Sequence, residues 1–308
     1  MRTNPICLSV ALIAFAATQA DARMTDAEIR QGFEEHAALA QYHRWYQVYE
    51  RPEGRLANAL DILTGDVVVT SGLGNATGRD EYAARVKQLP ETWRNAHHVR
   101  STEITHHADG TMTLAAEILY QNEGMLPDGT VRQAELSYDV SLVPGQSVLP
   151  LLSEVRIEQA GEPEEGGTFE DAYAENRMRS LVHYWLALIE DPARDPDPVR
   201  EILAEDVRLD FSSGAITDFE GFADWLAGPG SQVAASTHEI GNFSVEEAGE
   251  GVYRVGMDFD WNGLLPDGTR MVAKTRHDWT VENDVSERFA RIRTIDVEVL
   301  EPLRPVAD

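Results

Sequence analysis

The chain has 308 residues and a formal net charge of −27 at pH 7, with 53 acidic against 26 lysine and arginine side chains. A surface this acidic repels nucleic acid and anionic lipid, so we expect neither as a partner. The charge also argues against an anionic substrate, unless arginine is locally concentrated. Cys7 is the only cysteine, which excludes an intramolecular disulfide and a site of several thiolates.

Residues 1–22 are predicted to be a secretory signal peptide. Arg2 provides a positive end, residues 7–17 form a short apolar run, and Ala-Asp-Ala at residues 20–22 has the small-x-small pattern of a cleavage site. We therefore expect cleavage after Ala22 and a periplasmic or secreted protein. The rest of the chain has no apolar stretch of about 18 residues, so no membrane association is expected after cleavage.

The remaining chain repeats itself. His-Arg-Trp at residues 43–45 returns as His-Tyr-Trp at 183–185, an offset of 140, and Leu-Pro-Asp-Gly-Thr at 126–130 returns at 265–269, an offset of 139. A nearly constant offset over several landmarks indicates two tandem copies of one folding unit. The segment between the copies is rich in glycine and glutamate, which is typical of a linker. The predicted division is a first domain at 23–160, a linker at 161–167 and a second domain at 168–308.

Each copy is expected to open with a long helix. Thr25 and Glu28 have the spacing of a capping box, as do Thr168 and Asp171 at the start of the second copy. Apolar and aromatic residues then recur at helical spacing. A short helix, a strand, a third helix and four strands are expected to follow in both copies. The predicted fold class is α+β: two tandem cone-shaped barrels, each a curved antiparallel sheet wrapped on its long N-terminal helix.

Several of these features are shared with a known superfamily. They include Leu-Ala-Glu-Asp-Val at residues 203–207 entering a strand, a histidine after the third helix at His98 and His238, and the strand segments at 119–122 and 138–140. With them the chain resembles the nuclear transport factor 2-like superfamily, in particular SnoaL-like and ketosteroid-isomerase-like members, duplicated in tandem. The resemblance implies the cone fold. It does not specify a reaction, because this fold hosts both enzymes and non-catalytic binding proteins.

Asp139 and Asp278 are the first candidates for chemistry. They occupy matching positions, and each follows an aromatic or imidazole residue, Tyr138 or His277, on a predicted strand. The resemblance implies that this position holds the pocket aspartate of ketosteroid isomerases, where an apolar site keeps the carboxyl protonated. A buried carboxyl could equally act as a general base with a raised pKa. The alternative for both residues is an outward-facing strand aspartate.

Histidines are the second set of candidates, because imidazole exchanges protons near neutral pH. We expect His98 and His238 to act as proton-transfer partners of the aspartates, the alternative being histidines satisfied by the backbone. His97 has no counterpart in the second copy and is expected to be exposed. His106 and His107 lie toward the opposite end of the same predicted strand, a poor spacing for a metal site. Neither a metal nor a cofactor is expected.

Aromatic and imidazole side chains are expected to line the cones. The resemblance implies that the long helix supplies a pocket hydroxyl, and Tyr42 is the candidate for it in the first copy, whereas the second copy has Val182 there. Plain core packing is the alternative for the aromatic residues. The predicted substrate-binding residues are His43, Trp45, Tyr46, Tyr120, Tyr138, His183, Trp185, Trp261 and His277.

Two functions remain open from the sequence. The first is a cofactor-free acid/base enzyme of the lyase, isomerase, dehydratase or cyclase type, acting on a hydrophobic ring-containing small molecule. The resemblance includes lyases that act on lignin-derived aromatic compounds. The alternative is a non-catalytic periplasmic ligand-binding or assembly protein whose two copies pack sheet to sheet. A homo-oligomer stays open in either case. An open pocket holding Asp and His favours the enzyme, and two filled cones favour the alternative.

Overall fold

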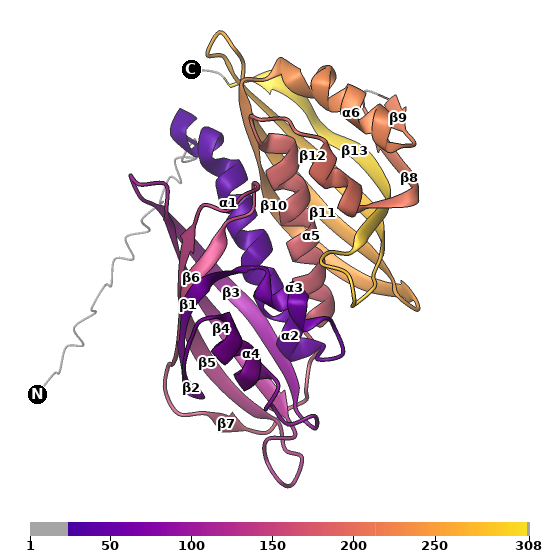
Figure 1. Cartoon of the computed structure of the whole chain (residues 1–308). Coiled ribbons are helices and arrows are strands. Elements are labelled where there is room, and N and C mark those ends of the chain that lie inside the picture. The colour runs from indigo at the N-terminus through magenta and orange to yellow at the C-terminus, as the bar shows by residue number, and fades with distance from the viewer. Residues whose placement is uncertain (1–23, 213, 307–308) are drawn as a thin grey trace, which may run out of the picture.

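Two curved sheets, each with its own helices, make up the molecule (Figure 1). The computed structural model describes residues 24–212 and 214–306, so the predicted signal peptide lies outside the described residues. The two long helices, α1 (Asp26–Trp45) and α5 (Tyr173–Glu190), contact each other between the sheets. This arrangement confirms the predicted α+β class with one cone-shaped unit in each half. Within the described residues, no helix has the length and apolar character needed to cross a membrane.

The first sheet is built around α1. This helix begins at the predicted capping box, in which the Glu28 N–H donates to Thr25 Oγ1 at 3.2 Å and the Thr25 N–H donates to Glu28 Oε2 at 2.5 Å. The sheet has the order β2-β1-β6-β5-β4-β3, with β7 added beside β5, and β1 runs parallel to β6 while the other pairs are antiparallel. The further helices are α2 (Gln47–Glu50), α3 (Leu56–Leu60) and α4 (Arg79–Val86). The strands are β1 (Leu63–Ser71), β2 (Gly74–Thr77), β3 (Arg94–His106), β4 (Met112–Glu123), β5 (Arg132–Val143), β6 (Leu151–Gln159) and β7 (Glu164–Glu165).

The second sheet repeats this plan with the order β10-β11-β12-β13-β8-β9, in which β8 runs parallel to β13. The helical elements after α5 are the 3-10 helix η1 (Asp197–Glu201), α6 (Phe219–Ala227) and the 3-10 helix η2 (Pro229–Gln232). The strands are β8 (Leu203–Phe211), β9 (Gly214–Ile216), β10 (Ala235–Gly249), β11 (Val252–Leu264), β12 (Arg270–Glu282) and β13 (Arg291–Pro305).

The start of α5 differs from the prediction. The helix begins at Tyr173, and its N-cap residue Ala172 makes no side-chain capping bond, so the capping box predicted from Thr168 and Asp171 is wrong. Asp171 instead accepts hydrogen bonds from the Tyr173 N–H at 2.9 Å and from Arg51 Nη2 at 2.7 Å. Its carboxylate therefore joins the start of the second unit to the end of α2 in the first.

The segment at 161–167 lies along the first sheet. Its short strand β7 pairs with Arg132 and Gln133 of β5, and the Gly166 N–H donates to the Val131 carbonyl at 2.8 Å. A glycine-rich segment can follow a sheet edge in this way because glycine adopts positive φ, as Gly166 and Gly167 do here. The predicted linker therefore contributes to the rim of the first cone.

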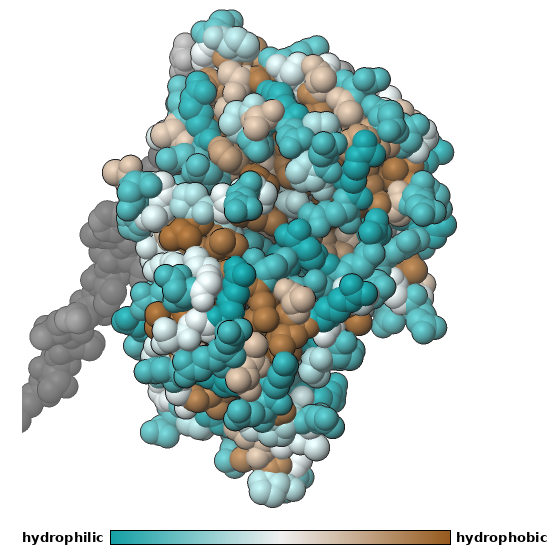
Figure 2. All heavy atoms as spheres, in the orientation of Figure 1, coloured by the Kyte–Doolittle hydropathy of each residue, from teal (hydrophilic) through white to brown (hydrophobic). Residues whose placement is uncertain are grey.

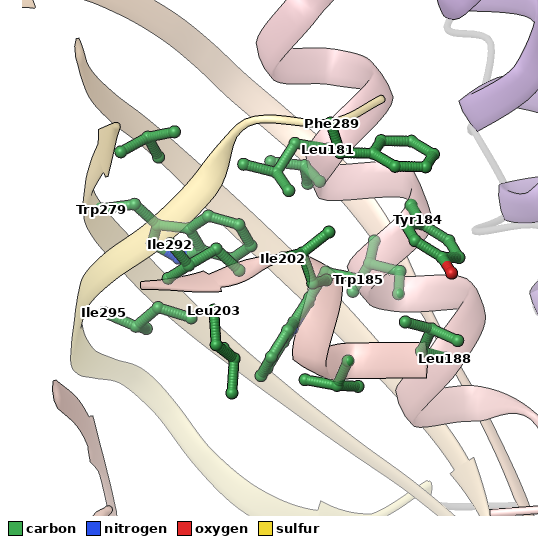
Figure 3. Packing of buried hydrophobic residues seen from close by; sticks show 14 of the residues in the cluster. Leu181, Tyr184, Trp185, Leu188, Ile202, Leu203, Trp279, Phe289, Ile292 and Ile295 are labelled. Carbon is green, nitrogen blue, oxygen red and sulfur yellow. The ribbon is translucent and has the colours of Figure 1, made fainter. Parts of the chain in front are cut away.

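The concave faces of the sheets are packed differently. In the first unit, α1 buries Tyr42 and Trp45 in the core, together with Tyr46 directly after the helix. In the second, Trp185 and Trp279 meet edge to face with ring centroids 5.9 Å apart, and apolar side chains of β8, β13 and α5 close around them (Figure 3). Burying each such side chain contributes about 1.5–3 kcal/mol to stability. The interior of the second cone is thus occupied by its own side chains.

A twofold-like relation links the two units through their long helices. Ser180 Oγ donates to the Ala40 carbonyl at 2.8 Å, and His43 stacks on His183 with centroids 5.8 Å apart and planes 7° apart. Both pairs join residues separated by the repeat length, as expected near a twofold axis. The sheet-to-sheet pairing considered for a non-catalytic assembly protein is therefore wrong, because helices form this interface. Gly32 lets α1 approach β10, since a Cβ there would lie 2.1 Å from Thr237 Oγ1.

Candidate active site

A cavity of about 380 Å³ opens in the first cone. Its walls are mainly apolar, with Val69 from β1, Leu136 from β5 and Ile157 from β6, and a few polar side chains enter it from α2, α4 and β3 to β6. Cavities of this size with apolar walls and few polar groups are typical of small-molecule sites. The polar side chains in the wall include those of Tyr49, Arg85, Asn95, His97, Tyr120, Arg132 and Tyr138.

His97 and Glu50 form a hydrogen-bonded pair at the wall of this cavity. His97 is 5% exposed, and its Nδ1 lies 3.1 Å from Glu50 Oε1, which also accepts the His97 backbone N–H at 2.9 Å. Because the carboxylate accepts, we assign the ring proton to Nδ1, which leaves Nε2 with a free lone pair. The ring stacks on Tyr46 with centroids 4.6 Å apart, so its orientation is held by packing as well.

The second unit supplies the residue that holds this carboxylate. Asn176, from α5, is 2% exposed and donates from Nδ2 toward Glu50 Oε1 at 3.0 Å, Glu50 Oε2 at 3.3 Å and the His97 carbonyl at 2.9 Å. Its Oδ1 lies 3.0 Å from His43 Nδ1. The Glu50 side chain is fully buried, and a buried carboxylate requires partners of this kind. The Glu50–His97 pair is therefore completed across the interface between the units.

Two phenol hydroxyls, those of Tyr120 and Tyr138, belong to the wall of the same cavity. Burial raises the pKa of Tyr138 well above its usual value, and its side chain lines the cavity. Tyr120 donates to Asn95 Oδ1 at 2.8 Å, and burial raises its pKa to about 12. Both phenols are therefore protonated at neutral pH, and Tyr138 has a proton to offer a ligand.

The two aspartates predicted to act in the pockets lie elsewhere. Asp139 and Asp278 are both exposed, whereas the residues preceding them on the strands face inward. Side chains alternate between the faces of a strand, so buried Tyr138 and Val140 place Asp139 on the outer face, opposite Arg156 on β6. The assignment of either aspartate to a pocket is therefore wrong.

The histidine prediction is corrected by one residue. His97, expected to be exposed, lines the cavity, while His98 points to the other face and its Nε2 lies 3.1 Å from the Glu170 carbonyl. In the second unit His238 takes the role of His97, with Nδ1 2.7 Å from Glu190 Oε1. One additional residue before β10 explains the shift. The repeat of Glu50 as Glu190, at the same offset as His43 and His183, was the available signal for this pair.

The other predicted residues divide between the cavity, the core and the interface. Tyr120 and Tyr138 line the cavity. Tyr42 lies behind its wall and accepts a hydrogen bond from Tyr46, so the hydroxyl role predicted for Tyr42 falls instead to Tyr138. Trp45 and Tyr46 lie in the core of the first unit, and Trp185 lies in the core of the second, where His277 packs against Phe259. Trp261 is half-buried over Gly263, and His43 and His183 lie at the interface.

The pair in the second unit has different surroundings. His238 packs edge to face on Phe259, whose ring contacts His277 with centroids 4.6 Å apart. Burial raises the pKa of Glu190 well above its usual value and lowers the pKa of His277 to about 4. His36 takes the place that Asn176 has in the first site, with Nε2 3.0 Å from the His238 carbonyl. The second unit therefore retains a carboxylate–imidazole pair, whose imidazole lies outside the first cone and lines a cavity between the units.

Removing the Asn176 amide is expected to lower activity without removing a group that touches the ligand. In Asn176→Ala, Glu50 loses the amide that donates to both of its oxygens, so the carboxylate no longer fixes the orientation of the His97 imidazole as closely. A small misplacement of a catalytic group can lower the rate by about 100-fold. We expect kcat to fall by about ten- to 100-fold, KM to change little, and the pH–rate profile to shift. Ser180→Ala, which removes another buried interface hydrogen bond, is the control. Equal losses in the two variants would contradict a positioning role.

Acidification is expected to destabilise the interface through its buried histidines. Burial lowers the pKa of His36 to about 4 and of His43 to about 3, from 6.5. As the pH falls below 6.5, the unfolded chain therefore binds more protons at these histidines than the folded chain does. The contribution of the neutral, buried imidazoles to the free energy of unfolding is fully present above pH 6.5 and is lost progressively toward pH 4. Each histidine contributes a loss of about 1.4 kcal/mol per pH unit in that window.

Urea unfolding of the wild type and of His36→Gln between pH 7.5 and 5 measures this effect. The comparison is needed because acidification also relieves repulsion among the many carboxylates. The free energy of unfolding of the wild type is expected to approach that of the variant as the pH falls. A pH-independent difference between the two proteins would contradict the account.

Among the described residues, no group of three or more His, Cys, Asp or Glu side chains is placed to hold a metal ion. No protein-family model matches the chain, and no curated protein does either. Solved structures similar to one half of it exist.

One is the hexachlorocyclohexane dehydrochlorinase LinA-type3 from Novosphingobium barchaimii, at 15% identity over 43% of this chain and 90% of that one, with a TM-score of 0.37. Another is ActVI-ORFA from Streptomyces coelicolor, at 17% identity over 39% and 92% of the two chains, with a TM-score of 0.34. A third is a nuclear transport factor 2-like superfamily protein from Salmonella enterica, at 11% identity over 41% and 90%, with a TM-score of 0.37. These similarities concern the fold alone, and the third structure bears the name of the superfamily that the sequence resembles.

Proposed function

We propose that the first unit is an acid/base enzyme that needs no cofactor and removes a proton from a mostly apolar, ring-containing small molecule. The observation that carries this proposal is the buried Glu50–His97 pair at the wall of an open, largely apolar cavity. A paired carboxylate and imidazole are suited to general base catalysis, because the carboxylate fixes the tautomer and stabilises the imidazolium that forms.

In this mechanism His97 Nε2 accepts a proton from a C–H or O–H group of the ligand. The Glu50 side chain, held by Asn176 and the His97 backbone N–H, accepts from His97 Nδ1 and stabilises the charge that develops on the ring. The Tyr138 hydroxyl donates to oxygen that becomes negative as the proton leaves. General base catalysis of this kind typically increases the reaction rate by about 10²–10⁴-fold.

The walls of the cavity favour a ring-containing ligand. Trp93, Tyr120 and Tyr138 offer aromatic faces and edges, and Leu136 and Ile157 offer aliphatic surface. Lyases, isomerases, dehydratases and cyclases of this kind share proton removal as a step, so the proposal covers that group of reactions. Lignin-derived aromatic compounds are a candidate substrate class, and a periplasmic or secreted location belongs to the proposal as well.

Hydrogen–deuterium exchange tests the proposal without knowledge of the natural substrate. Aryl ketones with acidic C–H groups, from 4-hydroxyacetophenone to 2-tetralone, are incubated with the full chain in D₂O and followed by ¹H NMR. We expect exchange faster than in buffer for part of the panel, and the same rate with His238→Gln, whose imidazole lines a separate cavity between the two units. Ligand binding with no accelerated exchange anywhere in the panel would support a binding protein instead.

A further inference from the structure

Among the described residues, no aspartate or glutamate side chain lines the first-unit cavity directly, although the protein is strongly acidic, and the carboxylate of Glu50 lies behind His97. Two arginines, Arg85 from α4 and Arg132 from β5, lie in that wall together with His97. The cavity is therefore a locally basic region in a molecule whose net charge is −27. Figure 2 shows how widely hydrophilic residues cover one face of this surface, with hydrophobic residues in small groups between them.

Arg85 is only partly satisfied by the protein. Its Nη1 donates to the Gly74 carbonyl at 2.9 Å, whereas its Nη2 is buried and has no hydrogen-bond partner among the described residues. Its positive charge acts on the hydroxyl pair of Tyr49 and Tyr82, whose oxygens lie 2.7 Å apart. A buried guanidinium N–H without a partner is unfavourable, so Arg85 would gain a hydrogen bond by turning this group toward an acceptor bound in the cavity.

Arg132 is also without a carboxylate. Its Nη2 donates to the Gln159 amide oxygen at 2.7 Å, and no acidic side chain of the described residues lies within ion-pair distance of it or of Arg85. Neighbouring arginines of the same sheet differ in this respect: Arg94 pairs with Glu123, Arg100 with Glu135 and Arg156 with Glu154. In a protein with an excess of carboxylates, Arg132 is the exception among the arginines of this sheet.

We propose that this cavity selects ring compounds that carry a carboxylate, with Arg85 as the main recognition residue and Arg132 as the second. The planar guanidinium presents parallel N–H donors that match the two oxygens of a carboxylate. The ring occupies the apolar walls, and the anionic group lies against the arginines. The inference rests on the proposed function for the location of the substrate, but it concerns affinity rather than chemistry.

The negative charge of the whole protein makes such local pairing necessary. A carboxylate approaching the surface is repelled by the excess of acidic groups, an effect that salt screens over about 10 Å at 0.1 M. Inside the cavity, screening is weaker and a charge-assisted hydrogen bond is stronger than in water. A charge-assisted bond of ordinary strength corresponds to about a tenfold gain in affinity or more over an uncharged analogue.

Isothermal titration calorimetry on the full chain, with biphenyl-4-carboxylate and its neutral analogue biphenyl-4-carboxamide, tests this inference. We expect the carboxylate to bind at least about tenfold more tightly than the amide. The preference should fall to within about twofold in Arg85→Met, be reduced in Arg132→Met, and persist in part in Arg85→Lys, which keeps the charge. Arg156→Met is the matched control, because Arg156 lies on the outer face of β6 and pairs with Glu154.

The His97→Gln variant separates this inference from the proposed function. This variant lacks the base but should still bind the carboxylate more tightly than the amide. If the carboxylate preference is found and the wild type shows no catalysis, only the proposed function is contradicted and the inference on binding stands. Equal affinities for the two probes, no binding of the carboxylate, or an unchanged preference in both methionine variants would each overturn the inference. Circular dichroism melting of the variants shows whether they are folded when binding is measured.

Discussion

Replacing His97 with glutamine is expected to lower the rate of proton abstraction by about 10²–10⁴-fold while leaving the protein folded. Glutamine keeps a polar group near Glu50 but has no atom that accepts a proton at neutral pH. The ring it replaces is nearly buried and is held by Glu50 and Tyr46, so the lost function is that of one oriented base. The rate of hydrogen–deuterium exchange by NMR measures the effect, with the thermal melting curve as a check on folding.

His98→Gln is the matched control for this variant. The two histidines are adjacent on β3, but His98 faces away from the cavity and contacts the Glu170 carbonyl. The control is expected to retain the activity of the wild type within about twofold. Similar losses from the two changes would show that the strand, rather than the His97 imidazole, determines the rate.

Replacing Trp279 with alanine is expected to destabilise the second unit by about 3–5 kcal/mol. The indole is 1% exposed and packs edge to face on Trp185, so its removal leaves an apolar cavity in the core as well as lost burial. Urea unfolding at pH 7.5 measures the change as a lower midpoint at an unchanged slope. Below the unfolding range, the variant should bind ligands in the first unit as the wild type does.

Asp278→Asn is the control at the neighbouring position. Its side chain is exposed on the outer face of the same strand, so the free energy of unfolding should change by no more than about 0.5 kcal/mol. A large decrease in the free energy of unfolding for Asp278→Asn, together with a small one for Trp279→Ala, would show that Asp278 faces the core and Trp279 faces solvent, and would contradict this structure of β12.

The fold could be predicted because its signals are repeated and local. The offset that joins His43 to His183 indicates two units, and aromatic residues at helical spacing predict the buried face of α1. The capping box at Thr25 is confirmed. The corresponding box at Thr168 is wrong because Asp171 bonds Arg51 of the other unit, a contact that no local pattern contains.

The site was predicted less well, and the errors have physical causes. Asp139 lies between Tyr138 and Val140, and the alternation of a strand by itself places it outward. The resemblance favoured the opposite face. The Glu50–His97 pair joins residues far apart in the sequence, and Asn176 comes from the other unit, so only tertiary packing brings the three together. One additional residue before β10 separates His97 from His238 by one position more than the repeat offset, so the constant offset matched His238 to His98 instead.

The proposed chemistry requires that His97 presents the lone pair of Nε2 to a ligand in the first cone while Glu50 holds its Nδ1. Nitrogen-15 NMR of the histidine side chains, assigned with the His97→Gln variant, tests this most directly. We expect a proton on Nδ1 at pH 7.5 and a shift of the Nε2 resonance when biphenyl-4-carboxylate is added. A proton on Nε2, together with a resonance that does not respond to the ligand, would contradict it.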